Sequence, residues 1–110
     1  MEYGNKVAYV VSKQKYNMDE ISKLNLYLNS IGIGTGSAVK ITFGLVEEKD
    51  SNDFVAKSEI EVTYTTKKLN VPVDVIDIKG EYYIKFVFAR TAGAQQCYVS
   101  GGHGITGEPK

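Results

Sequence analysis

The sequence predicts an all-β domain in which two antiparallel sheets pack as a β-sandwich. Short segments of alternating apolar and polar residues recur along most of the chain, and this period of two is typical of half-buried strands. Polar or glycine-rich stretches separate these segments and suit turns. The length of 110 residues suits a single domain. We therefore expect about seven or eight strands in one sandwich.

The individual strands follow from the clearest alternations, taken in chain order. Val39, Ile41 and Phe43 alternate with polar or small residues and define a half-buried strand. Pro72 lacks a backbone N–H, so its strand is expected at a sheet edge or with a local irregularity. The expected strands cover residues 7–11, 22–30, 39–45, 60–65, 71–75, 82–88 and 97–99.

Residues 18–31 are compatible with two structures. Several apolar residues in this stretch recur at helical spacing. Leu24, Leu26 and Leu28, however, alternate with asparagine and tyrosine, and asparagine is unfavourable inside a helix. We expect a strand over residues 22–30, with a helix as the alternative.

Composition and charge exclude several classes of partner. The 13 basic and 13 acidic residues cancel, which argues against nucleic-acid binding by phosphate neutralisation. No apolar run approaches the ~20 residues that a membrane-spanning helix needs, so no membrane insertion is expected. Residues 1–6 lack the apolar region of a signal peptide. Cys97 is the only cysteine, so no disulfide can form within the chain.

No set of residues has the pattern of a catalytic, cofactor or metal site. Cys97 and His103 are each the only residue of their type, and no third group completes a nucleophilic arrangement or a zinc site. Asp50, Asn52 and Asp53 are spaced like oxygen ligands but lack the full calcium-loop pattern, so a solvated turn is expected there. We expect no enzyme, no cofactor and no metal.

A glycine-rich tail or linker is expected over residues 101–110, after a sandwich domain of residues 1–100. Three triplets that each begin with glycine follow one another from Gly101. A simple linker and the start of a collagen-like stem both fit this pattern. A stem would make the protein a homotrimer.

The order of several segments resembles that of a known family. These segments are residues 21–28, 39–48, 56–63, 73–75 and 78–86, the last with a Gly80-Glu81-Tyr82-Tyr83-Ile84 turn and strand. The family is that of the jelly-roll β-sandwiches of the galactose-binding-like, carbohydrate-binding-module type, which occur in bacteriophage tail and fibre proteins. The resemblance covers residues 6–99. It implies a two-sheet jelly roll and often attachment to glycans or surfaces. The chain has no tryptophan, the residue that sugar-binding members usually expose.

The expected function is therefore that of a non-catalytic structural or attachment module. The resemblance implies the tail or fibre of a phage virion, or a similar extracellular surface assembly, with other subunits of that assembly as partners. The alternative is a carbohydrate-binding module, because tyrosine rings can stack on sugars and also hydrogen-bond to them. The residues expected to form one exposed glycan-binding face are Asn25, Tyr27, Asn29, Tyr83 and Lys85.

Overall fold

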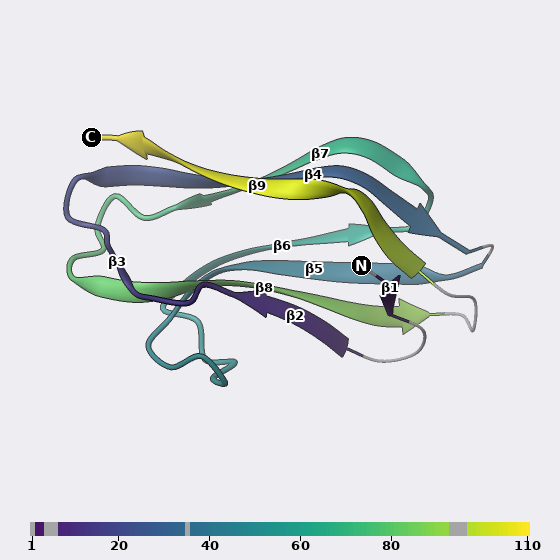
Figure 1. Ribbon diagram of the computed structural model, residues 1–110, viewed down its shortest axis with the longest axis horizontal. Coiled ribbons are helices and arrows are strands. Elements are labelled where there is room, and N and C mark those ends of the chain that lie inside the picture. Colours follow the sequence, from purple (N-terminus) through teal and green to yellow (C-terminus); the bar gives the residue numbers. More distant parts are fainter. Residues whose placement is uncertain (1, 4–6, 35, 93–96) are drawn as a thin grey trace.

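The computed structural model confirms the all-β sandwich (Figure 1). The structure describes residues 2–3, 7–34, 36–92 and 97–110. Its strands are β1 (Glu2–Tyr3), β2 (Val7–Val11), β3 (Tyr16–Asn17), β4 (Ile21–Ile33), β5 (Ala38–Val46), β6 (Ala56–Val62), β7 (Thr66–Asp74), β8 (Glu81–Ala92) and β9 (Cys97–Pro109).

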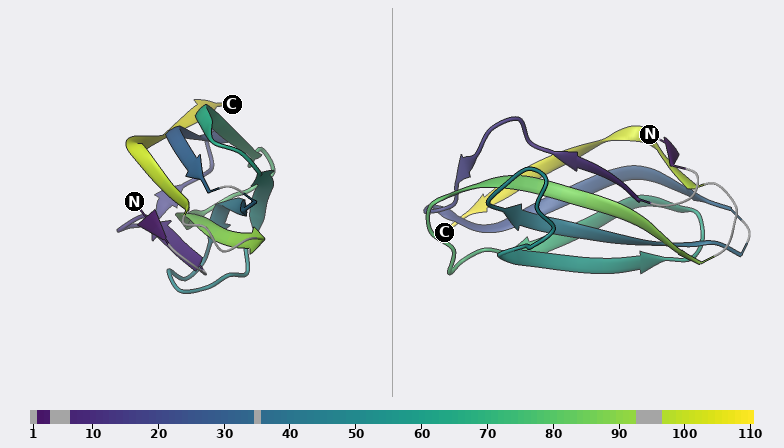
Figure 2. Two further views of the ribbon diagram at one scale, coloured as in Figure 1. Left: turned by 90° about the vertical axis from the view of Figure 1, so that its right-hand side faces the viewer. Right: turned by 90° about the horizontal axis from the view of Figure 1, so that it is seen from below.

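Two antiparallel sheets lie face to face, as the end-on view in Figure 2 shows. One has the strand order β1-β9-β4-β7 and the other the order β2-β8-β5-β6, with β3 adding to β8. The strands pair in a nested order, in which each successive pair encloses the one before it in the sequence. The pairs are β5 with β6, β4 with β7, β2 with β8 and β1 with β9. A long hairpin wrapped in this way over two sheets is a jelly-roll-like sandwich.

The core lies between the sheets and follows the predicted alternation. In β4, Leu24, Leu26 and Leu28 point inward and are almost fully buried. In β8, Phe86 and Phe88 point inward and meet edge to face, with ring centroids 5.5 Å apart. Residues 18–31 are thus mainly strand and not helix, because only a strand presents all three leucines to the same face.

β7 is an edge strand, as the proline in it predicted. Pro72 lies opposite Asn25 of β4, and the other side of β7 has no partner among the described strands. The missing N–H of a proline can be tolerated at an edge because that ladder position needs no donor there.

The C-terminal residues differ most from expectation. Residues predicted as a tail or linker belong to β9, which pairs with β4 along its length. Leu26 lies opposite Ile105, and Leu28 lies opposite His103. A bulge at Gly101–Gly102, where Gly102 has a φ of 85°, absorbs the change of register. The start of β9 was predicted as a strand over residues 97–99. Its continuation was not, because glycines have no side chain to reveal a period of two.

Candidate functional site

The structure divides the predicted glycan face between two sheets. Asn25, Tyr27 and Asn29 lie on β4, whereas Tyr83 and Lys85 lie on β8. The neighbouring leucines of β4 and the phenylalanines of β8 fill the space between the sheets. The predicted residues therefore occupy the two opposite outer surfaces of the sandwich and do not form one face.

Two of the predicted residues are buried beneath other parts of the chain. Asn25 is 5% exposed, and its Nδ2 donates a hydrogen bond to Oε2 of Glu108 at 2.8 Å. This bond joins β4 to β9 on the outer surface of their sheet. Lys85 is 1% exposed, although its strand position also points outward. Neither side chain is available to a ligand in this structure.

Lys85 is covered by the connection between β5 and β6, which extends away from the sheets in Figure 1. Its Nζ donates to the carbonyl oxygen of Ser51 at 2.7 Å and to Oδ1 of Asn52 at 3.3 Å. The same Nζ lies 4.5 Å from the centre of the Tyr9 ring, a favourable cation–π position. The turn expected around Asp50 is thus a cap over the lysine.

Burial lowers the pKa of the Lys85 ammonium, and the nearby Asp50 carboxylate only partly opposes this. The folded-state pKa is below the ordinary 10.5, so between these two values the unfolded chain binds more protons than the folded chain. Stability contributed through Lys85 therefore rises with pH across that window. We expect the free energy of unfolding of the wild type, measured relative to Lys85→Met, to increase with pH and to level off above 10.5.

Urea unfolding at a series of pH values measures this difference. Lys13→Met, which removes a lysine from an exposed position, controls for the loss of one positive charge. A difference between wild type and Lys85→Met that stays constant or falls with pH would contradict the prediction.

An apolar groove runs along one side of the sandwich, between the edge strands β2 and β9. We call this side the open side and the groove the open-side groove. Its volume is about 440 Å³. It is lined by Val10, Val11, Ser12, Tyr16, Asn17, Met18, Ile21, Leu24, Ile84, Phe86, His103, Ile105, Thr106 and Gly107.

The walls of this groove are continuous with the core. Met18 and Phe86 at its floor are 1% exposed, whereas Ile105 at its rim is 37% exposed. The His103 ring packs on Phe86, with ring centroids 5.2 Å apart. His103 was predicted to lie in a tail, so its contact with the core was not expected. On the opposite side of the sandwich, β6 and β7 follow one another through a short turn.

A second depression lies on the outer surface of the sheet that contains β4. Its volume is about 360 Å³, and Tyr27, Asn29, Lys68 and Gly104 are among the residues that line it. The Tyr27 side chain is 45% exposed. Gly104, its partner across the strands, has no side chain to cover the ring. Two of the five predicted glycan-binding residues therefore do share a concave surface.

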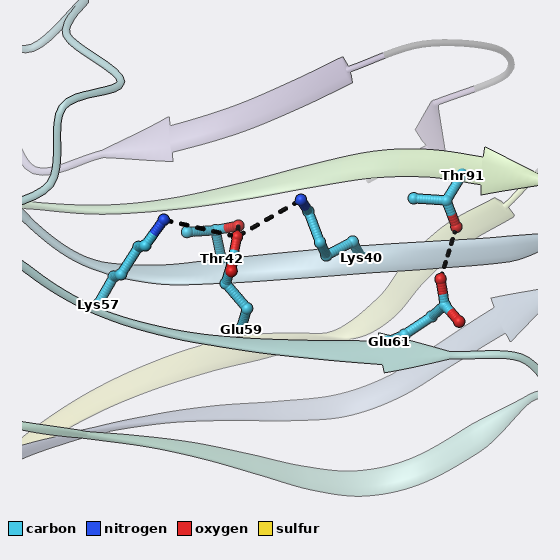
Figure 3. A network of polar contacts seen from close by, with 6 residues as sticks. All are labelled: Lys40, Thr42, Lys57, Glu59, Glu61 and Thr91. Atoms are coloured by element: carbon cyan, nitrogen blue, oxygen red, sulfur yellow. Dashed lines mark hydrogen bonds and ion pairs between the residues drawn. The ribbon is translucent and has the colours of Figure 1, made fainter.

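The outer surface of the other sheet carries a network of charged and hydroxyl groups (Figure 3). Glu59 Oε2 lies 3.4 Å from Lys40 Nζ and 3.8 Å from Lys57 Nζ. These ammonium groups, Lys40 first, lower the pKa of the Glu59 carboxyl below its ordinary value. Two hydrogen bonds extend the network, from Thr42 Oγ1 to Glu59 at 3.3 Å and from Thr91 Oγ1 to Glu61 at 3.0 Å. Exposed pairs of this kind suit a surface in contact with water.

Within the described parts of the chain, no three or more His, Cys, Asp or Glu side chains gather in a way that could hold a metal ion. Among the same residues no helix is long and apolar enough to cross a membrane.

Comparisons with known proteins assign no family to the chain. No family model matches the sequence, and neither a curated protein nor a solved structure matches it.

Proposed function

We propose that this chain is a non-catalytic structural or attachment module that acts through contacts between protein subunits on its open side. The observation that carries the proposal is the open-side groove, an apolar channel of about 440 Å³ between two edge strands. Clefts of this size that are lined mainly by apolar side chains are common binding sites. The resemblance of the sequence to phage tail and fibre sandwiches supports a virion or a similar surface assembly as its setting.

The three accessible surfaces differ in how well they suit such contacts. The outer surface of β5 and β6 carries the Glu59 network, whose charges interact with water and with each other. The outer surface of β4 offers only the depression beside Tyr27. The open side combines apolar walls with an edge of β9 that no described strand covers beyond Tyr98, where N–H and C=O groups can pair with another chain.

Photocrosslinking in living cells tests the proposal. A photoreactive amino acid is incorporated at position 105 while the cell synthesises the protein, and the cells are then illuminated. Ile105 lies at the rim of the groove, so we expect light-dependent crosslinks from this position to a protein subunit. Tyr64 is 72% exposed in the turn between β6 and β7 and serves as the control position. Crosslinking from position 64 but none from position 105 would overturn the proposal.

A second candidate function is glycan binding at the depression that contains Tyr27 and Asn29. An exposed tyrosine ring beside an amide can stack on a sugar and hydrogen-bond to it. If this function holds, Tyr27→Ala weakens binding on a glycan array or in titration calorimetry at least about tenfold, a loss of about 1.4 kcal/mol. Tyr83→Ala, on the opposite outer surface, leaves binding unchanged. Equal effects of both substitutions would exclude this depression as the binding site.

A further inference from the structure

The nested pairing of the strands leaves one strand position in the sandwich largely empty. β1 is the nested partner of β9 but covers only two of its residues, with Glu2 opposite Tyr98 and Tyr3 opposite Cys97. β9 continues to Pro109. Among the described strands, none pairs with the outer edge of β9 beyond Tyr98. The empty position lies at the rim of the open-side groove, because His103, Ile105 and Gly107 also line that groove.

This free edge lacks the features that usually prevent pairing between chains. Natural edge strands are often protected by lysines, inward-pointing charges or an irregular backbone. From His103 to Gly107 the edge carries no Lys, Arg, Asp or Glu. Its irregular positions, the Gly102 bulge and Pro109, lie at its two ends. The edge between them is suited to accept a strand.

We propose that the strand it accepts is β9 of a second copy of this chain, antiparallel and centred on Ile105. The proposal rests on the proposed function, since it names the partner on the open side. β9 of the second copy would run in the direction of β1, because both are antiparallel to β9. A pairing of residues 103–107 with themselves stops short of Tyr98, so the second copy's β9 and β1 do not compete for the same place.

The residues opposite one another in this register are complementary. A centre on one residue pairs odd positions with odd positions, so side chains that face the groove meet others that face it. Ile105 meets Ile105 of the second copy, which joins two apolar rims. His103 meets Gly107, so the large ring lies opposite a residue with no side chain. Thr106 meets Gly104, so no charges are opposed along the regular part of the edge.

The second sheet can take part in the same association. β2 also lines the groove and has no partner on its outer side among the described strands. A two-fold axis through the Ile105 pair also brings the β2 edges of the two copies toward one another. We call the resulting contact between the copies, formed by β9 and β2, the seam. Specific interfaces bury about 1,200–2,000 Å² in total, and the use of both sheets gives this seam more area than one strand pair supplies. The zero formal net charge leaves no overall repulsion between copies.

Light scattering across a concentration series, with two charge variants at position 105, tests this proposal. The wild type is expected to form a dimer. Ile105→Lys and Ile105→Glu each place like charges opposite one another at the two-fold axis, so each should raise the dimer dissociation constant at least about a hundredfold. An equimolar mixture of the two variants pairs lysine with glutamate and should restore the dimer. Ile76→Lys, at an isoleucine 49% exposed in the turn before β8, should leave the dimer intact.

Each other outcome overturns the inference. A wild type that is folded by circular dichroism and monomeric at every concentration excludes self-pairing. A dimer that survives both charge variants places the seam elsewhere, and a mixture that stays monomeric shows that the two positions do not meet. The proposed function has its own readout, because crosslinks from position 105 to a different protein would retain it while excluding a second copy as the partner.

Discussion

Deletion of residues 101–110 is expected to abolish cooperative folding of the domain. The deletion removes β9 from alongside β4 between Ile21 and Leu28. It also removes Gly107 and Ile105 from their places opposite the core residues Leu24 and Leu26. Each backbone hydrogen bond lost costs about 1 kcal/mol, and a domain has only about 5–15 kcal/mol of stability.

Thermal unfolding followed by circular dichroism measures this effect. The matched control removes residues 1–3 at the other end of the chain, where the described pairing of β1 is with Cys97 and Tyr98. We expect a sharp transition for the control and none for the deletion of residues 101–110. A cooperative transition close to that of the wild type after this deletion would mean that these residues form a dispensable tail.

Gly44→Ala is expected to destabilise the domain by about 3 kcal/mol, because overpacking that moves the backbone costs about 1–3 kcal/mol and occasionally more. A Cβ at position 44 would overlap the carbonyl oxygen of Ala56 and come within 2.9 Å of Lys57 Cα. Both obstacles are backbone atoms of β6, which cannot turn aside as a side chain can. The substitution must therefore push β6 away from β5.

Gly104→Ala is the matched control for Gly44→Ala. A Cβ at position 104 meets no atom within 4 Å, so this change should alter stability by no more than about 0.5 kcal/mol. Urea unfolding of both variants gives the comparison. Equal stabilities would show that β5 and β6 are not packed as closely as the structure indicates.

The elements that were predicted best from the sequence are those in which buried apolar side chains alternate with outward-facing ones. The leucines of β4 and the phenylalanines of β8 alternate with other residues because one side of each strand faces the core. β9 was predicted only over residues 97–99, because Gly101, Gly102, Gly104 and Gly107 in the rest of it have no side chains that could alternate. Its place in the sheet comes from its pairing with β4, which local sequence does not reveal.

The predicted site shows a different limit of sequence-based inference. Alternation indicates on which side of its strand Tyr27 or Tyr83 lies, but it does not indicate which sheet each strand joins. The sheet that a strand joins depends on pairing between distant segments. This pairing places the two tyrosines on opposite surfaces of the sandwich. Lys85 was predicted to be exposed but is buried, because residues 51 and 52, more than thirty positions earlier, fold over it. The sequence near Lys85 contains no sign of this cover.

The nested pairing of β9 also has a consequence for the speed of folding. Its partners β1 and β4 come from the first third of the chain, with Glu2 opposite Tyr98 and Ile21 opposite Pro109. Contacts between such distant segments require large loops to close, so sandwiches of this kind fold in milliseconds to seconds, whereas helical bundles fold in microseconds to milliseconds. During synthesis, β4 leaves the ribosome long before β9, so the leucines of β4 stay incompletely covered until β9 has been made. This interval is when the chain is most exposed to aggregation.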